Sequence, residues 1–437
     1  MKVSISGIRG IFGDEFNLKD VINFCRNFST LIRTKKCVLG RDTRPSSKIL
    51  SDVASASLME RGISVYNLGI APTPVVFKES RQYGSGLIIT SSHNPLDWNG
   101  MKFIVDGRGI NESELKHLIK EKQFAKEKIG TEFEISSDYI DKAKKLIGHV
   151  NRKPKIALDV GGGAAFEVAP NLLNKIGCKV KSVNEKPGKT SRGPDPTVDK
   201  LLDLIKLSQK SDIAFAFDLD GDRLVVVKDS KKQAPDVTLG LGVAKALEIG
   251  YKKFVLSIDT SVSIEKLIKE EGGQVTRSKV GEANVVDLML KTKSQAGGEG
   301  SSAGFILPEF NMCRDGLLTS GLIASMIDMN RFQEVVRFME GYFQRRTKMN
   351  VDSRFHKKVM EILSCKMRKG FSEIISIDGI KSIIDEDSWI LVRQSNTEHT
   401  IRISTESNNL DKVRTIEKRI TELVKQSYEE ARRVRNH

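Results

Sequence analysis

Three aspartates at alternate positions, Asp218, Asp220 and Asp222, directly follow the apolar run IAFAF. Carboxylates this close together repel one another, and a hard divalent cation such as Mg²⁺ relieves that repulsion. The spacing excludes an EF-hand loop, because Gly221 precedes the third aspartate and Asp229 stands where that loop needs a glutamate. The motif therefore predicts a magnesium site, and the alternative is an acidic turn around the Asp-Gly dipeptide.

A polar loop with a serine beside a histidine, TSSHNP at 90–95, is the second candidate for chemistry. A serine hydroxyl is a poor nucleophile unless a neighbouring group activates it. Here His93 offers an imidazole to Ser92, and Lys102 adds an ammonium group a little further along. In isolation, the same residues are typical of a serine/threonine turn that ends at a proline.

Two further loops carry groups that bind sugars and phosphates. Glu299 and Ser301 lie in the glycine-rich stretch GGEGSSAG, where they can form hydrogen bonds with sugar hydroxyls. Arg393 and Ser395 lie in RQSNTE, and Arg402 follows. Guanidinium groups, hydroxyls and backbone N–H groups together form a good phosphate cradle. Each loop also has a structural alternative, a flexible surface loop for the first and a polar hairpin for the second.

The surrounding patterns predict the elements that position these loops. Short apolar runs that enter polar loops alternate with amphipathic helical patterns, which indicates α/β architecture with parallel or mixed sheets. In such sheets, the loops that leave the carboxyl ends of the strands form the ligand crevice. The last part of the chain has strands around WILV and TIRIS followed by a charged helix, a pattern more typical of α+β packing. The strand-to-loop segments are KCVLGRDTR, GLIITSSHNP, PKIALDVGGG, SDIAFAFDLDGD and KKFVLSIDTS.

Length and composition limit the protein class. The 437 residues suggest about three domains of about 150 residues each. A hydrophobic content of 39% excludes wholesale disorder, and no run approaches the roughly 18 apolar residues that span a bilayer. The start lacks the pattern of a secretory signal. Five scattered cysteines without a CxxC pair argue against a disulfide framework and predict a reducing compartment.

The net charge of +15 suggests anionic partners without identifying them. Such a charge attracts nucleic acids and small phosphorylated substrates alike. Aromatic residues make up only 6%, and no RNA-stacking motif is present, which disfavours a nucleic-acid-binding protein. A nucleotide-binding loop at 159–163, DVGGG, lacks the Lys-Ser/Thr pair of a P-loop and the GxGxxG spacing. We expect its glycines to allow a tight strand-to-helix turn.

The four loops, together with GIRG at 7–10 and GRDTR at 40–44, follow one another in the order of the motifs of the α-D-phosphohexomutase superfamily. The chain therefore resembles this superfamily over nearly its whole length. Among the members of this superfamily, the archaeal ones have the most similar motifs. The resemblance implies an α/β fold of four domains around a central cleft, with three related mixed-sheet domains and a smaller α+β C-terminal domain. The expected domains are 1–150 with the serine loop, 151–249 with the metal loop, 250–346 with the sugar loop and 347–437 with the phosphate loop.

The resemblance also implies a role for each loop. Ser92 carries the phosphoryl group, and Lys102 is the best candidate for the general acid/base. The implied catalytic residues are Ser92, Lys102, His93, Arg9 and Arg223. The implied Mg²⁺ ligands are Ser92, Asp218, Asp220 and Asp222. The implied substrate-binding residues are Glu299, Ser301, Arg393, Ser395, Asn396, Thr397 and Arg402.

The implied activity is that of an isomerase that interconverts hexose 1-phosphate and hexose 6-phosphate through a phosphoserine enzyme and a hexose 1,6-bisphosphate. We favour phosphoglucosamine mutase, with phosphomannomutase or phosphoglucomutase as the alternative. A catalytically inactive, sugar-phosphate-binding regulatory protein is the alternative from another class. The expected partner is a phosphosugar, without nucleic acid or membrane, and the expected state is a cytoplasmic monomer or homodimer.

Two loops depart from the common family pattern, and the departure in the sugar loop leaves the choice of substrate open. In the sugar loop, Ser302 and Ala303 follow the serine where many members have glycine and histidine. In the phosphate loop, Gln394, Asn396 and His399 replace two prolines and a glycine. The arginine, serine and threonine of that loop remain, so we expect phosphate binding to survive with altered loop stiffness.

Overall fold

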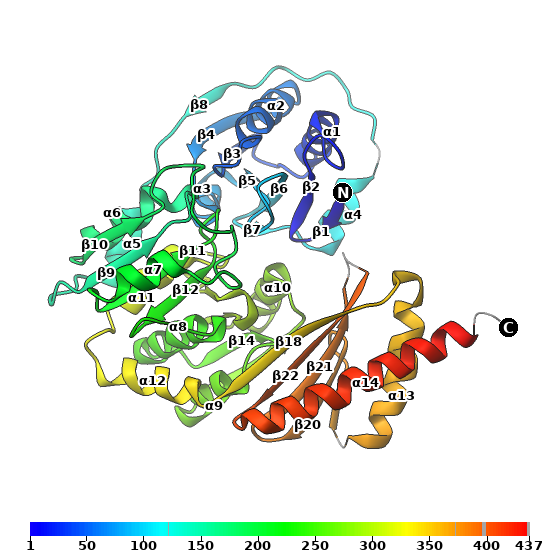
Figure 1. The fold of residues 1–437 in the computed structure, drawn as a ribbon. Helices are drawn as coiled ribbons and strands as arrows, with labels where there is room; N and C mark the ends of the chain where they lie inside the picture. Colours follow the sequence, from blue (N-terminus) through cyan, green and yellow to red (C-terminus); the bar gives the residue numbers. More distant parts are fainter. Residues whose placement is uncertain (121, 372, 396–398, 435–437) are drawn as a thin grey trace.

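Four sheets, each built from one continuous stretch of chain, organise the protein (Figure 1). The computed structural model describes residues 1–120, 122–371, 373–395 and 399–434. Each sheet carries its own helices, so the chain forms four consecutive units. This arrangement confirms the four-domain α/β architecture predicted from the sequence.

The first unit is built on a mixed sheet of eight strands. Strands β4, β3 and β5 are parallel, and β6 runs antiparallel beside β5. The strands are β1 (Lys2–Ser4), β2 (Gly7–Ile11), β3 (Lys36–Arg41), β4 (Ser64–Ile70), β5 (Ser85–Ile89), β6 (Trp98–Val105), β7 (Arg108–Gly109) and β8 (Glu132–Glu134). The helices of this part are α1 (Leu18–Ser29), α2 (Ser47–Glu60), α3 (Thr73–Tyr83), α4 (Glu112–Ile119) and α5 (Tyr139–Ile147).

The second and third units repeat the central strand order of the first. In each unit the second strand pairs with the first, the first with the third, and the third with an antiparallel fourth strand. The second sheet contains β9 (Lys155–Asp159), β10 (Lys179–Val183), β11 (Ile213–Phe217), β12 (Leu224–Lys228) and β13 (Lys231–Lys232). The third contains β14 (Lys253–Ser257), β15 (Gln274–Ser278), β16 (Ala296–Glu299) and β17 (Gly304–Ile306). The three α/β units therefore share one strand order, as the prediction of three related domains requires.

Helices of the second and third units enclose one continuous apolar core. It extends from Tyr139 on α5 to Met339, takes in Val75 on α3 of the first unit, and includes the wholly buried helix α11 (Gly316–Ala324). Each of these two units therefore depends on the other for burial of its apolar surface. The remaining helical elements are η1 (Ala164–Phe166), α6 (Val168–Lys175), α7 (Leu202–Ser208), α8 (Pro235–Ile249), α9 (Val262–Glu270), α10 (Glu282–Thr292), η2 (Gly300–Ser302) and α12 (Asn330–Glu340).

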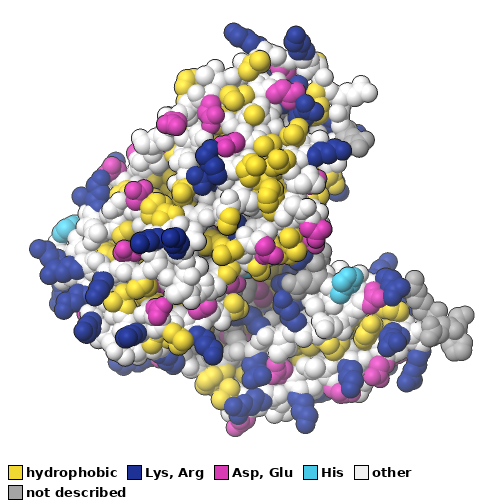
Figure 2. Space-filling model, turned by 45° about the horizontal axis from the view of Figure 1, so that its top comes forward, with side chains coloured by type: hydrophobic (Ala, Val, Ile, Leu, Met, Phe, Trp, Pro, Cys, Tyr) yellow, Lys and Arg dark blue, Asp and Glu magenta, His cyan; other side chains and the backbone are white. Residues whose placement is uncertain are grey.

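The C-terminal unit has a different fold and its own core. Its five strands form a wholly antiparallel sheet, in the order β18-β22-β21-β20-β19, against which two long helices pack. Figure 2 shows a hollow between this unit and the rest of the molecule. The elements are β18 (Phe343–Asn350), η3 (Ser353–Phe355), α13 (His356–Gly370), β19 (Glu373–Ile375), β20 (Ile380–Asp385), β21 (Ser388–Gln394), β22 (Thr400–Ser407) and α14 (Leu410–Val434).

Two further expectations concern cysteines and membranes. All five cysteines are free, and four of them are buried as small apolar side chains. In the part of the chain that the structure describes, no helix combines the length and apolar character that a bilayer crossing needs.

The DVGGG segment forms the tight strand-to-helix turn that we predict for it. It links β9 to η1, and Gly161 and Gly162 have φ values of +60° and +62°, which favour glycine. At Gly163, the backbone packs directly on the metal loop, because an added Cβ would lie 2.6 Å from the carbonyl oxygen of Leu219. The glycines therefore bring this turn against the loop that carries the three aspartates.

We expect Gly163→Ala to destabilise the protein, because the methyl group would overlap a backbone that other contacts hold in place. Overpacking of this kind costs about 1–3 kcal/mol, which thermal unfolding would register as a melting temperature lower by several degrees. Gly109→Ala is the matched control, since nothing lies within 4 Å of an added Cβ there. Equal melting temperatures for the two variants would contradict the close packing at Gly163.

Candidate active site

The three chemical loops of the first three units occupy the same topological position. The serine loop at 90–97 links β5 to β6, the metal loop at 218–223 links β11 to β12, and the sugar loop at 300–303 links β16 to β17. Each loop therefore connects the third strand of its unit to the antiparallel fourth strand. This shared position explains why the chemistry gathers at equivalent ends of three sheets.

Ser92 is fully buried and has a left-handed backbone with a φ of +49°. Its amide donates a hydrogen bond to the Thr90 hydroxyl at 2.9 Å. Its Oγ donates to Oδ2 of Asp218 at 2.8 Å, across an interval of 126 residues. The seryl oxygen therefore lies directly against the metal loop of the second unit.

Arg44 holds the serine loop in this strained shape. Its guanidinium donates to the carbonyl oxygens of Ser92 at 2.6 Å, Asn94 at 2.7 Å and Trp98 at 3.0 Å. Its Nε is paired with Asp42 at 3.0 Å, and both side chains are fully buried. A rigid fork of donors suits this task, because several carbonyls can be bound at once.

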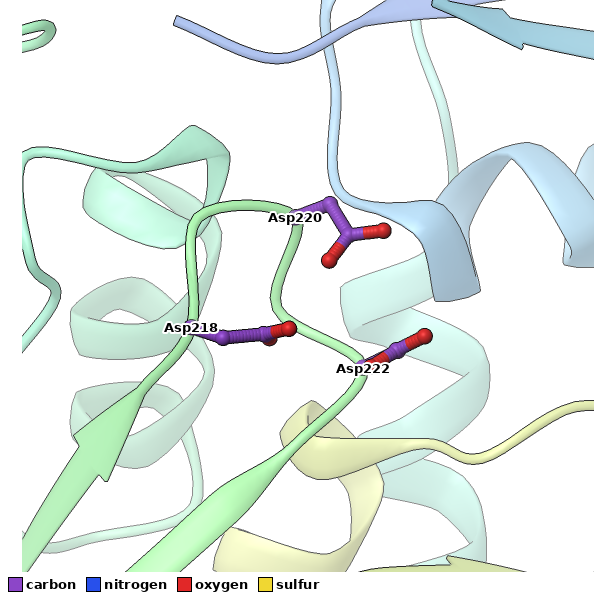
Figure 3. Close-up of side chains that lie close together, drawn as sticks. All are labelled: Asp218, Asp220 and Asp222. Carbon is purple, nitrogen blue, oxygen red and sulfur yellow. The ribbon is translucent and has the colours of Figure 1, made fainter. Parts of the chain in front are cut away.

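The three aspartates point their carboxylates to the same side of the metal loop (Figure 3). One oxygen of each lies within 4.8 Å of the others, and Asp218, Asp220 and Asp222 are all fully buried. Oδ1 of Asp220 and Oδ1 of Asp222 have no hydrogen-bond partner. Buried acceptors without a partner are costly, and hard carboxylate oxygens suit Mg²⁺. The residues present therefore fit a divalent cation.

Cations from two other units compensate the charge of the triad. From β6, the Nζ of Lys102 lies 2.7 Å from Oδ2 of Asp220 and 2.9 Å from Oδ2 of Asp222. From the third unit, Arg314 reaches Oδ2 of Asp222 at 2.8 Å. The Thr73 hydroxyl donates to Asp220 at 2.6 Å. The site is therefore complete only when three units are assembled.

These surroundings shift the pKa values of the three carboxyl groups in different directions. Burial raises the pKa of Asp218, and the neighbouring charges of Asp220 and Asp222 raise it further. Burial also raises the pKa values of Asp220 and Asp222, but nearby cations outweigh it and both values are lowered overall. Lys102 acts on both carboxyl groups, and Arg314 acts on Asp222 as well. Asp218 is therefore the member of the triad that most needs a cation in order to ionise.

The other predicted catalytic side chains surround Ser92. Nδ1 of His93 lies 3.3 Å from Ser92 Oγ, and its Nε2 lies 3.5 Å from a guanidinium nitrogen of Arg223. Burial lowers the pKa of His93 well below its usual value, and the nearby arginines lower it further, so the imidazole is neutral. Arg9, on β2, donates to the Asn94 side chain at 3.2 Å.

The sugar loop is connected to the metal loop through Arg314. The guanidinium that pairs with Asp222 also binds Oε2 of Glu299 at 2.8 Å, and the amide of Gly281 donates to Oε1 at 2.5 Å. Ser301 forms a side-chain hydrogen bond with Asp259. Glu299 and Ser301 therefore face protein partners here and must exchange these contacts to bind a ligand.

The phosphate loop lies on the C-terminal unit. Arg393 is paired with Asp378 at 2.7 Å, and the same carboxylate accepts from the amide of Val280 at 3.0 Å. In the strand register, Arg393 faces Arg402, and Arg402 faces Lys348 on β18. These three side chains therefore form a row of cations across β21, β22 and β18. Ser395 is nearly buried beside this row, and Asn396 and Thr397 lie outside the described residues.

Sequence reasoning missed the residues that join the loops. Arg314 lies in an Arg-Asp-Gly stretch after β17, where it had no assigned role, and Arg44 belonged to a motif used only for the resemblance. Both bind partners that are distant in the sequence. The local signal that marks both is an arginine within two positions of an aspartate, in a loop that follows a strand.

Comparisons with known proteins agree with this geometry. Four models of the phosphoglucomutase/phosphomannomutase family match in succession, namely alpha/beta/alpha domains I, II and III and the C-terminal domain, at residues 1–129, 137–231, 235–342 and 346–423. A probable phosphoglucosamine mutase of Methanosphaera stadtmanae is 34% identical over 94% of this chain and 96% of the relative. A phosphoglucomutase/phosphomannomutase of Thermococcus kodakarensis is 31% identical over 93% and 95%.

Solved structures share the fold. A phosphoglucomutase/phosphomannomutase family protein from Burkholderia thailandensis matches with a TM-score of 0.84 at 23% identity, over 99% of this chain and 98% of that one. Aspergillus fumigatus N-acetylphosphoglucosamine mutase, solved with GlcNAc-6P and magnesium, matches with a TM-score of 0.61 at 12% identity, over 98% and 96%. Four matching domain models and relatives aligned over nearly their full length confirm the predicted superfamily, and the chain belongs to the phosphoglucomutase/phosphomannomutase family.

Proposed function

We propose that the protein is a phosphohexomutase, an isomerase that interconverts hexose 1-phosphate and hexose 6-phosphate through phosphorylated Ser92. The observation that carries this proposal is the distance of 2.8 Å between Ser92 Oγ and the metal-loop carboxylate of Asp218. A phosphoryl group on that oxygen would lie against three carboxylates. Such a dianion requires a strong local positive charge, which is what phosphoryl transfer also demands.

The metal role that we propose for the triad rests on its unpartnered oxygens. A Mg²⁺ ion held by Asp218, Asp220, Asp222 and the phosphate on Ser92 would neutralise the phosphoryl charge and polarise its oxygens. Lys102 and Arg314 already occupy the Oδ2 atoms of Asp220 and Asp222. They therefore orient the triad and leave the two free Oδ1 atoms for a ligand.

The proton transfers that accompany each phosphoryl step have two candidate groups. When phosphoserine donates to a sugar hydroxyl, the P–O bond to Ser92 breaks and a P–O bond to the sugar forms. The hydroxyl proton passes to a base, and the seryl oxygen takes up a proton as it leaves. The neutral imidazole of His93 can accept a proton beside Ser92. Burial lowers the pKa of Lys102, but Asp220 and Asp222 raise it above its usual value. Lys102 is therefore held as an ammonium group, and it could give a proton to the seryl oxygen only when its ion pairs with these aspartates loosen.

The second phosphate of the sugar would be held by the C-terminal unit. We infer that Arg393, Ser395 and Arg402, with Asn396 and Thr397 of the same loop, form that clamp. A row of cations across β21, β22 and β18 supports this role. Because a hexose 1,6-bisphosphate must reorient between the two transfers, the clamp has to accept either phosphate. Fixing that remote group makes the transfer effectively intramolecular.

We propose glucosamine phosphate as the preferred substrate. Relatives named probable phosphoglucosamine mutase support this choice, including the one at 34% identity. A relative named phosphoglucomutase/phosphomannomutase, at 31% identity, supports the alternative substrates. The inactive regulatory protein remains the alternative from another class, and the complete set of Ser92, triad and Lys102 argues against it.

Ser92→Ala should lower turnover by at least about a thousandfold, the scale typical for loss of a nucleophile, while leaving the melting temperature nearly unchanged. A coupled mutase assay primed with a trace of hexose bisphosphate measures this effect. Intact-protein and peptide mass spectrometry should find phosphate on Ser92 of the wild type. Ser91→Ala is the matched control, because among the described residues the hydrogen bond of Ser91 Oγ is to the neighbouring Asn94, at 3.2 Å, and not to the metal loop. Comparable turnover in Ser92→Ala would refute the phosphoserine route.

Asp218→Asn should stabilise the metal-free protein at neutral pH and remove its response to Mg²⁺. Because the folded pKa of Asp218 is raised, the folded state binds more protons than the unfolded state above about pH 4. Stability from this group therefore falls as pH rises toward the raised value. Melting temperatures in chelator at pH 5 and pH 8, and then with Mg²⁺, measure the effect.

Asp229→Asn serves as the control for that experiment, because Asp229 is an exposed aspartate that follows β12. It should keep both the pH trend and the stabilisation by Mg²⁺. A variant at Asp218 that still gains stability from Mg²⁺ as the wild type does would contradict the metal assignment.

A panel of glucosamine, glucose, mannose and N-acetylglucosamine 1-phosphates tests the substrate. We expect the highest kcat/KM for glucosamine 1-phosphate, by about tenfold or more, a difference of about 1.4 kcal/mol in transition-state binding. Higher values for mannose or glucose would favour the alternative mutase. Binding of phosphosugars without turnover of any would favour the regulatory protein.

A further inference from the structure

An irregular segment at 184–200, between β10 and α7, packs against the metal loop from outside the active site. Arg192 belongs to this segment, and its side chain is only 5% exposed. One guanidinium nitrogen donates to the carbonyl oxygen of Phe217 at 2.5 Å, and Nε pairs with Oδ2 of Asp159 at 2.7 Å. No role follows for this arginine from the chemistry described above.

The carbonyl of Phe217 belongs to the peptide bond that leads into Asp218. Because a peptide unit is planar, a hydrogen bond that fixes this carbonyl also fixes the direction in which the Asp218 residue begins. Arg192 therefore holds the entry to the metal loop through the backbone, without touching any of the three carboxylates.

The partner of Arg192, Asp159, is itself fixed by hydrogen bonds. Oδ1 of Asp159 accepts from the amide of Gly161 at 2.8 Å and from the Asn184 side chain at 3.1 Å, so the carboxylate that receives Arg192 is fixed at both oxygens. A Cβ at Gly161 would lie 2.7 Å from the Arg192 guanidinium, so the glycine permits this close approach. The DVGGG turn and the arginine therefore fit each other.

The DVGGG turn and the segment at 184–200 hold the metal loop at two further points. The amide of Ala164, next in the turn, donates to the carbonyl of Leu219 at 2.7 Å. At the end of the loop, Asp195 of the outer segment accepts from Arg223 at 3.3 Å. Entry, middle and exit of the loop are therefore all fixed from one side.

We propose that Arg192 is a positioning residue that sets the geometry of the metal loop and thereby its affinity for a divalent cation. This inference rests on the metal role proposed for Asp218, Asp220 and Asp222. Partners of this kind beyond the direct ligands typically change metal affinity by about 10- to 100-fold when they are altered.

The sign of the effect separates positioning from simple electrostatics. Arg192→Met removes a positive charge and leaves the Asp159 carboxylate unpaired, so through-space electrostatics alone would tighten cation binding. Positioning predicts weaker binding instead. Arg192→Lys keeps the charge, but a single ammonium group lacks the fork that spans both Asp159 and the Phe217 carbonyl. Both variants should therefore bind a cation more weakly.

The test is a Mn²⁺ titration of the metal-stripped full chain, followed by electron paramagnetic resonance of free Mn²⁺. We expect the dissociation constant to rise about tenfold or more in Arg192→Lys and Arg192→Met, with far-UV circular dichroism unchanged. Lys186→Met, an exposed residue of the same segment, should bind Mn²⁺ as the wild type does. In mutase assays, raised Mn²⁺ should restore much of the activity of Arg192→Lys, which a general folding defect would not allow.

Each result decides the question. If the wild type binds Mn²⁺ and both Arg192 variants bind it equally well, or Arg192→Met binds it more tightly, the positioning role is wrong while the metal role stands. If Arg192→Met does not fold, Arg192→Lys decides by the same criterion. If the wild type itself binds no Mn²⁺, the metal role fails and this inference fails with it.

Discussion

Mutual repulsion among three buried carboxylates on one short loop is the constraint around which the active site is arranged. Asp218, Asp220 and Asp222 are fully shielded from water, where unbalanced charges are most costly. Arg223 of the same loop lies 3.9 Å from Asp218, but the counter-ions of Asp220 and Asp222 at hydrogen-bond distance come from other units, Lys102 from the first and Arg314 from the third. The electrostatic demand of a single loop therefore ties three units together.

A repeated topology places different chemistry at equivalent positions. Each α/β unit links its third strand to an antiparallel fourth strand through a short loop, and these loops carry Ser92, the aspartates or the glycine-rich stretch with Ser301. An aspartate also lies at the carboxyl end of the equivalent central strand in each unit, namely Asp42 after β3, Asp159 at the end of β9 and Asp259 after β14. Two of these aspartates orient an arginine that holds a catalytic loop, Arg44 for the serine loop and Arg192 for the metal loop.

A chain of polar contacts joins the C-terminal unit to the metal loop. Arg393 pairs with Asp378, which binds the Val280 amide, and the next amide donates to Glu299. Glu299 then pairs with Arg314, which reaches Asp222. A phosphosugar that displaced these contacts would exchange protein partners for its own hydroxyls and phosphates. Ion pairs and hydrogen bonds therefore already link the loop of Arg393 and the loop of Glu299 to the metal loop.

The sequence by itself determined the α/β class, the distinct C-terminal unit and the loops that carry Ser92 and the aspartate triad, because strand patterns and loop motifs are local. It also indicated that the DVGGG glycines serve a tight turn. Only the tertiary structure decided that Lys102 is a counter-ion of the triad and that Arg314 and Arg192 support the metal loop. Those contacts join residues 118 and 92 positions apart in the first two cases, and packing between units, not local pattern, brings such residues together.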